Sequence, residues 1–287
     1  MKVTDILKKK KPVFSFEFFL PKSPEAKQQF QETLEKLKPF APDFVSLTYG
    51  AGGSARAETV ELAGEIKNKH GFETMMHLTC VAHSKPEIAA IVKRVKDLGI
   101  ENILALRGDL PKDAPVTPLE QRDYRFATDL IKHLKGLDGF CLGVAGYPEK
   151  HPEAPSKEKD LEHLKEKVAA GADFITTQLF FDNQDYFDFV DKARAIGIGL
   201  PIIPGIMPIT NVNQVQKFSA MCGAKVPSGL LKDLESAKND PRAVIDVSIE
   251  HAIKQCKELL AKGAPGVHFY TLNRSAATRE ILKGLKS

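Results

Sequence analysis

The stretch from Ser84 to Asp109 reads SKPEIAAIVKRVKDLGIENILALRGD and contains one complete unit of the expected fold. Ser84 and Glu87 form a capping box, in which a hydroxyl and a carboxylate satisfy backbone N–H groups at the start of a helix. Apolar residues then recur every three or four positions until Gly99, where a C-terminal glycine belongs. The apolar run at Ile103–Arg107 predicts a strand that is buried on both faces.

Similar units recur along the chain, with a helix, a glycine and a strand in succession. Ser23-Pro24 opens one expected helix, and Asp160 is expected to cap another that Gly171 closes. The longer stretch from Cys222 to Asp240 predicts an extra short helix. Eight short runs rich in Val, Ile, Phe and Thr predict strands at Val13–Phe19, Phe44–Tyr49, Thr74–Thr79, Ile103–Arg107, Cys141–Gly146, Phe174–Leu179, Ile202–Gly205 and Val267–Thr271.

Eight such units without a change in composition predict an α/β fold, a single (β/α)8 TIM barrel that forms one domain over residues 1–287. One or more short extra helices are expected before the last strand. The alternative is an open doubly wound sheet, which usually needs fewer strands.

The composition narrows the class of protein. Hydrophobic residues make up 43% of the 287 residues and charged residues 27%, as in a globular domain with an ample core. The 41 Lys and Arg and 37 Asp and Glu give a net charge of +4, and the two signs are interleaved, which argues against a nucleic-acid partner. No apolar run is long enough to span a membrane, and no secretory core follows Met1. We therefore expect a cytoplasmic protein.

The four cysteines form no C-x-x-C pair and no cluster with histidine at zinc spacing. Their positions predict buried thiols in a reducing compartment and no structural metal.

Polar and aromatic residues gather at the carboxyl ends of the expected strands, where the loops of a barrel build an active site. The strand starts carry no comparable groups, so the pattern predicts an enzyme. The strand-end residues are Glu17, Thr48-Tyr49-Gly50, His77-Leu-Thr79, Arg107-Gly-Asp109, Tyr147-Pro-Glu-Lys-His151, Gln178, Gly205-Ile-Met-Pro208 and Tyr270-Thr-Leu-Asn-Arg274.

Glu17 is the most informative of these residues because it stands among four phenylalanines in Phe14-Ser-Phe-Glu-Phe-Phe19. Desolvation there would raise the pKa of its carboxyl, as a general acid working near neutral pH requires. The alternative is an inward-pointing barrel glutamate paired with Arg107 or with a lysine of a neighbouring strand. Arg107-Gly-Asp109 has a comparable alternative, a surface salt bridge in a loop.

The run Gly50-Ala-Gly52-Gly-Ser-Ala55 matches a dinucleotide-binding fingerprint. Such a site also needs an acidic residue at the end of the next strand, which instead ends in Leu78-Thr79-Cys80. We interpret the run as a glycine-rich barrel loop and keep a flavin-free Rossmann dehydrogenase as the alternative.

Eight motifs in order cover essentially the whole chain, and together they resemble the 5,10-methylenetetrahydrofolate reductase family of flavin-dependent barrel enzymes, in the bacterial form with a catalytic domain only. They are Phe14-Ser-Phe-Glu-Phe-Phe19, Val45-Ser-Leu-Thr-Tyr-Gly50, His77-Leu-Thr-Cys80, Leu104-Ala-Leu-Arg-Gly-Asp-Leu-Pro111, Tyr147-Pro-Glu-Lys-His-Pro-Glu153, Thr177-Gln-Leu-Phe-Phe-Asp182, Ile203-Pro-Gly-Ile-Met-Pro208 and His268-Phe-Tyr-Thr-Leu-Asn-Arg274.

The resemblance implies non-covalent FAD and a ping-pong transfer of hydride from NADH or NADPH to 5,10-methylenetetrahydrofolate. The product would be 5-methyltetrahydrofolate, which supplies methyl groups for methionine synthesis. It also implies a homo-oligomer with no membrane or nucleic-acid partner. The chain ends soon after the expected eighth helix, so no regulatory domain and no control by S-adenosylmethionine are expected.

The resemblance also assigns site residues. Glu17 falls on the general acid, and Asp109 on a carboxylate that faces both flavin and pterin. FAD contacts are implied for Tyr49, Ala51, His77, Arg107, Gly108, Asp109, Ala127, Tyr147, His151, Ala154, Asp160 and Lys167. Substrate contacts are implied for Thr48, Gln178, Gln214, Phe218 and Arg274, with Gln178 and Phe218 shared by folate and nicotinamide.

The residue types suit these roles. Arg107 and Lys167 can meet the charge of a diphosphate, and Asp160 suits a ribose hydroxyl. Gln214 and Phe218 are four positions apart on an expected helix opened by Thr210, so both can face one cavity, although Phe218 alone would suggest ordinary helix packing. The chain departs from the family pattern at Leu20, Phe126, His163 and Glu166.

A different class, a non-catalytic flavoprotein subunit that docks to a partner reductase, stays open. The carboxylates of Glu17 and Asp109 argue against it, because binding alone needs no acid.

Overall fold

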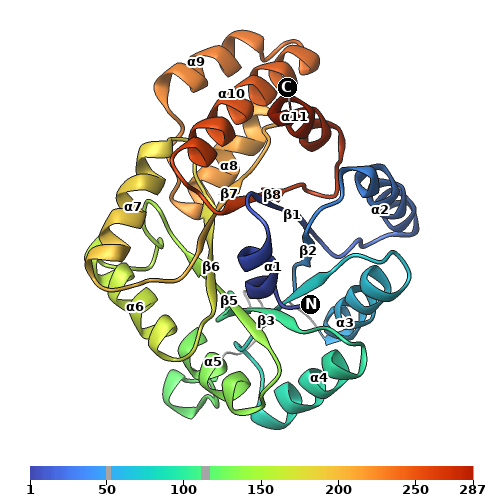
Figure 1. Cartoon of the computed structure of the whole chain (residues 1–287), viewed down its shortest axis with the longest axis vertical. Helices are drawn as coiled ribbons and strands as arrows, with labels where there is room; N and C mark the ends of the chain where they lie inside the picture. The colour runs from blue at the N-terminus through green and yellow to red at the C-terminus, as the bar shows by residue number, and fades with distance from the viewer. Residues whose placement is uncertain (50–52, 111–116, 287) are drawn as a thin grey trace.

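The computed structural model describes residues 1–49, 53–110 and 117–286, and its strands close into a parallel barrel (Figure 1). Each strand pairs with the next, and the first pairs with the last through Val13–Glu17 and Gly266–Tyr270. This closure confirms the TIM barrel and excludes the open doubly wound sheet. The strands are β1 Val13–Phe18, β2 Phe44–Leu47, β3 Thr74–Thr79, β4 Asn102–Leu106, β5 Cys141–Gly146, β6 Phe174–Leu179, β7 Ile202–Ile206 and β8 Gly266–Tyr270.

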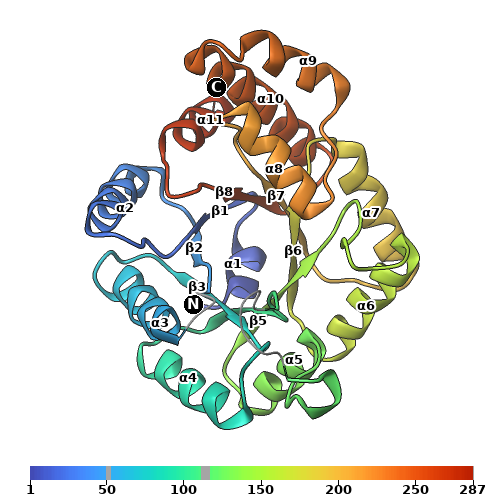
Figure 2. The ribbon, with the colours of Figure 1, turned by 180° about the vertical axis from the view of Figure 1, so that it is seen from behind.

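Helices surround the strands, and the extra helix expected after Cys222 is present as α9 (Figures 1 and 2). The capping box of Ser84 and Glu87 is also confirmed at the start of α4. The helices are α1 Val3–Lys9, α2 Pro24–Leu37, α3 Gly53–Asn68, α4 Lys85–Asp97, α5 Ala127–Gly136, α6 Lys157–Ala169, α7 Asn183–Ala195, α8 Val212–Cys222, α9 Ser228–Ala237, α10 Pro241–Ala261 and α11 Ala276–Lys286.

The expected cap at Asp160 is wrong. Helix α6 begins one turn earlier, where the side chain of Ser156 accepts a hydrogen bond from the backbone N–H of Lys159. Asp160 lies inside the helix and accepts a hydrogen bond from the backbone N–H of His151, at 3.0 Å. The residue that we assigned to the helix start therefore fixes the loop after β5.

Helix α1 closes the amino-terminal end of the barrel, in the middle of the strand ring (Figure 1). The backbone N–H of its Val3 donates to Asn102 Oδ1 of β4 at 2.8 Å. The apolar side of the helix packs into a buried cluster with the first inward residues of the strands, and burying such surface contributes about 25 cal/mol per Å². The cluster contains Val3, Ile6, Leu7, Val13, Phe44, Met75, Leu104, Cys141, Phe174 and Ile203.

The barrel interior becomes polar toward the carboxyl ends of the strands. Because side chains alternate along a strand, the residues two or four positions after a strand's member of the apolar cluster also point inward. Contacts between Ser15 and His268 and between Glu17 and His77 confirm this direction, since β1 and β3 are not neighbours. The polar layer contains Ser15, Glu17, Ser46, His77, Thr176 and His268, all buried.

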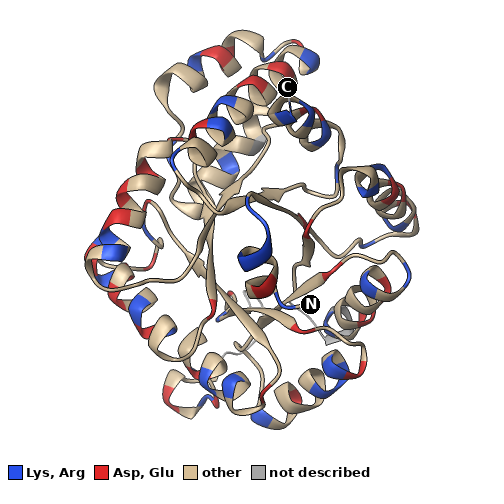
Figure 3. Cartoon of the chain, in the orientation of Figure 1, with Lys and Arg blue, Asp and Glu red and all other residues tan. Residues whose placement is uncertain are grey.

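Charges of both signs are interspersed over the outer helices (Figure 3). In the part of the chain that the structure describes, no helix has the length and apolarity needed to cross a membrane.

Candidate active site

Two adjoining pockets open at the carboxyl ends of the strands, and most of the expected site residues line them. The central pocket is lined by Glu17, Thr48, His77, Tyr147, Gln178 and Phe218, among others. The lateral pocket is lined by Arg107, Ala127, Tyr147, His151, Ala154, Asp160 and Lys167, among others. Both pockets include Leu106, Ala145 and Tyr147, so one long ligand can extend from one into the other.

Glu17 forms part of the floor of the central pocket and is 6% exposed. Its Oε2 atom lies 3.2 Å from Nε2 of His268 on β8 and 3.4 Å from Nε2 of His77 on β3. His268 in turn places Nδ1 2.7 Å from the hydroxyl of Ser15. Strands β1 and β8 therefore build a buried Ser15–His268–Glu17 chain, and His77 of β3 stands beside it.

The expectation of a raised pKa for Glu17 is wrong. Burial does raise the pKa, and it is the largest single effect, but the neighbouring charges of His77 and His268 outweigh it and hold the pKa below its usual value. The alternative pairing with Arg107 or a lysine is also wrong, because the carboxylate faces imidazoles. Burial lowers the pKa of His77, and the nearby carboxylate of Glu17 opposes this effect.

Two polar atoms that border the central pocket have no hydrogen-bond partner among the described residues. They are Nε2 of His77, whose contact with Glu17 is too poorly aligned for a hydrogen bond, and Oγ1 of Thr176. Buried polar atoms are nearly always paired with protein, water or a ligand. The central pocket is therefore suited to a ligand with polar edges.

The walls of the central pocket combine aromatic and amide groups. Tyr270 lies across Gly205, where any side chain would collide with its ring, and donates its hydroxyl to the carbonyl of Thr177 at 2.6 Å. Phe218 reaches the pocket from α8, which begins at Val212 and not at Thr210. Flat apolar surface above a polar floor suits a planar heterocycle.

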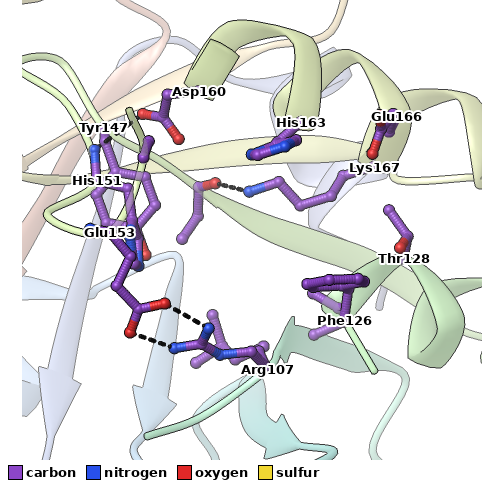
Figure 4. A pocket seen from close by; sticks show the side chains of 15 residues that line it. Arg107, Phe126, Thr128, Tyr147, His151, Glu153, Asp160, His163, Glu166 and Lys167 are labelled. Carbon is purple, nitrogen blue, oxygen red and sulfur yellow. Dashed lines mark hydrogen bonds and ion pairs between the residues drawn. The ribbon is translucent and has the colours of Figure 1, made fainter. Parts of the chain in front are cut away.

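The lateral pocket holds two cations, and both already have partners (Figure 4). Arg107 forms two parallel hydrogen bonds with Glu153, of 2.6 and 2.8 Å. Lys167 donates to the carbonyl of Ala145 at 2.6 Å, and burial lowers the pKa of its ammonium group to about 8. With these cations and the Tyr147 ring, the pocket can hold an anionic ligand with a flat group.

The remaining expected residues lie outside both pockets or outside the described part of the chain. The Tyr49 hydroxyl lies 3.2 Å from Nε2 of His83, and Asp109 and Arg274 are exposed. Gly108 has φ +84° and no room for a side chain beside Thr79. Ala51 and the side chain of Gln214 lie outside the described residues.

Sequence reasoning gave no role to Ser15, Glu153 or His268, although all three stand inside the motifs quoted above. A signal was present for Ser15, which precedes Glu17 by two positions and so shares its face of the strand. The contact of His268 with Glu17 follows only from the closed barrel.

Comparison with known proteins gives a consistent result over the whole chain. A family model described as Methylenetetrahydrofolate reductase matches residues 2–286. The chain is 38% identical over 295 residues to methylenetetrahydrofolate reductase (NADH) 1 of Arabidopsis thaliana, covering 99% of the chain and 50% of the relative. It is 40% identical over 267 residues to 5,10-methylenetetrahydrofolate reductase of Salmonella typhimurium, covering 93% and 88%. The chain thus spans about half the length of its plant relative.

A solved structure with a similar fold is a Clostridium thermocellum protein described as binding two copies of 5-methyl-5,6,7,8-tetrahydrofolic acid. It aligns with a TM-score of 0.64 at 14% identity, covering 98% of this chain and 96% of that chain. At this identity the likeness shows the fold alone.

Proposed function

Since the chain belongs to the methylenetetrahydrofolate reductase family, we propose that it is a single catalytic barrel domain that reduces 5,10-methylenetetrahydrofolate to 5-methyltetrahydrofolate. NADH or NADPH would supply the electrons through bound FAD. The observation that carries the proposal is Glu17, a buried carboxyl group on the floor of the central pocket that is hydrogen-bonded to His268 and lies beside His77.

The lateral pocket fits FAD by the chemistry of its residues. Arg107 and Lys167 would face the diphosphate, and Asp160 in the first turn of α6 would face a ribose. The shared wall at Tyr147 would let the flavin ring reach the central pocket. When bound, FAD would accept hydride from the nicotinamide and pass it to the folate.

Glu17 would supply the proton that opens the bridging ring of the folate to a reactive iminium. The Ser15–His268–Glu17 chain suits this role, because it is hydrogen-bonded in either protonation state. With Glu17 ionised, Nε2–H of His268 donates to the carboxylate and Ser15 donates to Nδ1. With Glu17 protonated, all these hydrogen bonds reverse, because a serine hydroxyl both donates and accepts.

A folate bound over Glu17 would also raise the pKa of the Glu17 carboxyl group. Burial is already the largest effect that raises the pKa of this carboxyl, and a planar ligand would remove the remaining water. We therefore propose that Glu17 is ionised in the free protein and takes up its proton when the folate binds.

The strands that the structure describes close into one barrel and form no Rossmann sheet, so the remaining rival is a non-catalytic flavoprotein subunit. A visible spectrum of the purified chain tests both the proposal and this rival. We expect flavin absorption that bleaches with NADH or NADPH under anaerobic conditions, and returns with 5,10-methylenetetrahydrofolate, in the absence of any other protein. Failure to bind FAD on reconstitution would contradict the proposal.

We propose either NADH or NADPH as the electron donor, because relatives are named for both, NADH in Arabidopsis thaliana and NADPH in Caenorhabditis elegans. The homo-oligomer, the cytoplasmic location and the link to methionine synthesis stay predictions. So do the roles of all the expected site residues, those of Asp109, Tyr49, Gln214 and Arg274 included.

The lowered pKa of Lys167 predicts that FAD affinity falls as the pH rises above 8. In the free protein its pKa is about 8, and a bound diphosphate would raise this value, so binding above pH 8 must take up a proton. Each pH unit should weaken binding by up to about tenfold until the pKa of the complex is reached.

Fluorescence titration of FAD between pH 7 and 9.5 measures this effect, and calorimetry in two buffers of different ionisation enthalpy counts the proton. Lys167→Met should bind FAD more weakly and without this pH dependence. Wild-type affinity that stays constant up to pH 9.5 would show that Lys167 does not face the diphosphate.

A further inference from the structure

In the lateral pocket, Arg107 already forms an ion pair with a carboxylate of the protein, that of Glu153 (Figure 4). Both terminal nitrogens of its guanidinium bind the two oxygens of Glu153, at 2.6 and 2.8 Å. This is the fork geometry with which arginine also binds phosphate groups. Glu153 thus occupies the donors that an anionic ligand of this pocket needs.

The backbone around Glu153 is fixed by its own hydrogen bonds. The N–H of Glu153 donates to Nδ1 of His151 at 3.1 Å, and the N–H of Ala154 donates to the carbonyl of His151 at 2.9 Å. The N–H of His151 is bound in turn by Asp160. Only the side chain of Glu153 therefore has to rotate to release Arg107.

Releasing Arg107 costs a moderate amount of free energy, which a more highly charged ligand can offset. The side chain of Glu153 is 61% exposed and that of Arg107 is 27% exposed. Exposed ion pairs contribute about 0 to 1 kcal/mol, and the two-bond geometry and the limited exposure of Arg107 place this pair at the upper end of that range or above it. A diphosphate carries more negative charge than one carboxylate and would repel Glu153 at close range. The two anions therefore compete for the same guanidinium.

We propose that Glu153 is an exchangeable internal counter-ion of Arg107, which a phosphate ester entering the lateral pocket must displace. Glu153 then determines how tightly the pocket holds ligands that bear a phosphate, and it has no effect on ligands that lack one. With FAD as the ligand, this inference rests on the proposed function. It goes beyond that function because it assigns a residue that opposes cofactor binding.

Glu153→Gln tests the inference, with Glu162→Gln as the matched control. Glu162 is equally exposed at 61% and is paired with Lys159 at 2.8 Å, but it does not line either pocket. The flavin-free chain is titrated with FAD and with riboflavin, which has no phosphate. Removing a competing ion pair of about 1 kcal/mol or more should tighten FAD binding by about fivefold or more. Riboflavin affinity, and both affinities of the control, should stay unchanged.

Weaker FAD binding by Glu153→Gln would show that Glu153 orients Arg107, and equal binding would show that it does not compete. Either result overturns the inference. If the wild type does not bind FAD, the proposed function fails separately, and titration with ADP then tests Glu153. Tighter ADP binding by the variant supports the exchange, whereas equal, weaker or absent ADP binding overturns it. Circular dichroism of each variant checks that the fold is retained.

Discussion

Glu17→Gln is expected to slow reduction of the folate by about 100-fold or more, while the half-reaction with the nicotinamide keeps nearly its normal rate. Glutamine has almost the same shape and can still hydrogen-bond His268, which lies 3.2 Å from Oε2 in the wild type. It has no acidic proton to give. Ring opening of the folate needs that proton, whereas hydride transfer from a nicotinamide does not.

Anaerobic stopped-flow absorbance measures the two half-reactions separately. Glu162→Gln, on the exposed part of α6, is the control and should leave both rates unchanged. Equal slowing of both half-reactions by Glu17→Gln would show that Glu17 is structural. Ser15→Ala adds a second measurement. It removes the partner of His268 Nδ1, and should slow only the folate half-reaction, by less than Glu17→Gln does.

The barrel was predictable because each unit carries its own local signals. The strand prediction at Thr74–Thr79 is confirmed without change, as are those at Cys141–Gly146 and Phe174–Leu179. Short runs of this length that are mostly apolar or β-branched, bounded by a glycine and a helix cap, have few other interpretations. The order of motifs at the strand ends then placed most of the expected site residues around two adjoining pockets.

The surroundings of Glu17 were not predictable, because they come from residues far away in the chain. His268 is 251 positions from Glu17. The phenylalanines next to Glu17 misled the pKa argument, since Phe16 and Phe18 point to the opposite face of the strand and pack in the outer core. The desolvation is real, but it comes from the barrel interior, which also supplies the imidazoles that oppose it.

Helix α1 was missed for a different reason. Its seven residues are too few to be stable as an isolated helix, so local pattern gives little signal. Val3, Ile6 and Leu7 become helical because they fill the open end of the barrel. Such an element depends on tertiary packing, which only the assembled barrel provides.

Gln178→Ala is expected to slow both half-reactions by about tenfold or more, the effect of losing about 1.4 kcal/mol of hydrogen bonding in each transition state. Gln178 stands at the end of β6 and lines the central pocket. Its Oε1 accepts a hydrogen bond from the N–H of Leu179 at 2.9 Å, which fixes the amide and directs its NH₂ group away from that contact. One amide in one pocket would then serve two substrates that bind in turn.

The same stopped-flow measurements test this prediction, with Gln184→Ala as the control. Gln184 is exposed on α7, where it hydrogen-bonds Asp188, and its loss should change neither rate. A defect of Gln178→Ala confined to the folate half-reaction would place the nicotinamide in a different site, and the two substrates would not share the central pocket. If Gln178→Ala slows both half-reactions and Glu17→Gln slows only the folate half-reaction, the two residues have different roles. Gln178 then positions both substrates, and Glu17 supplies the proton.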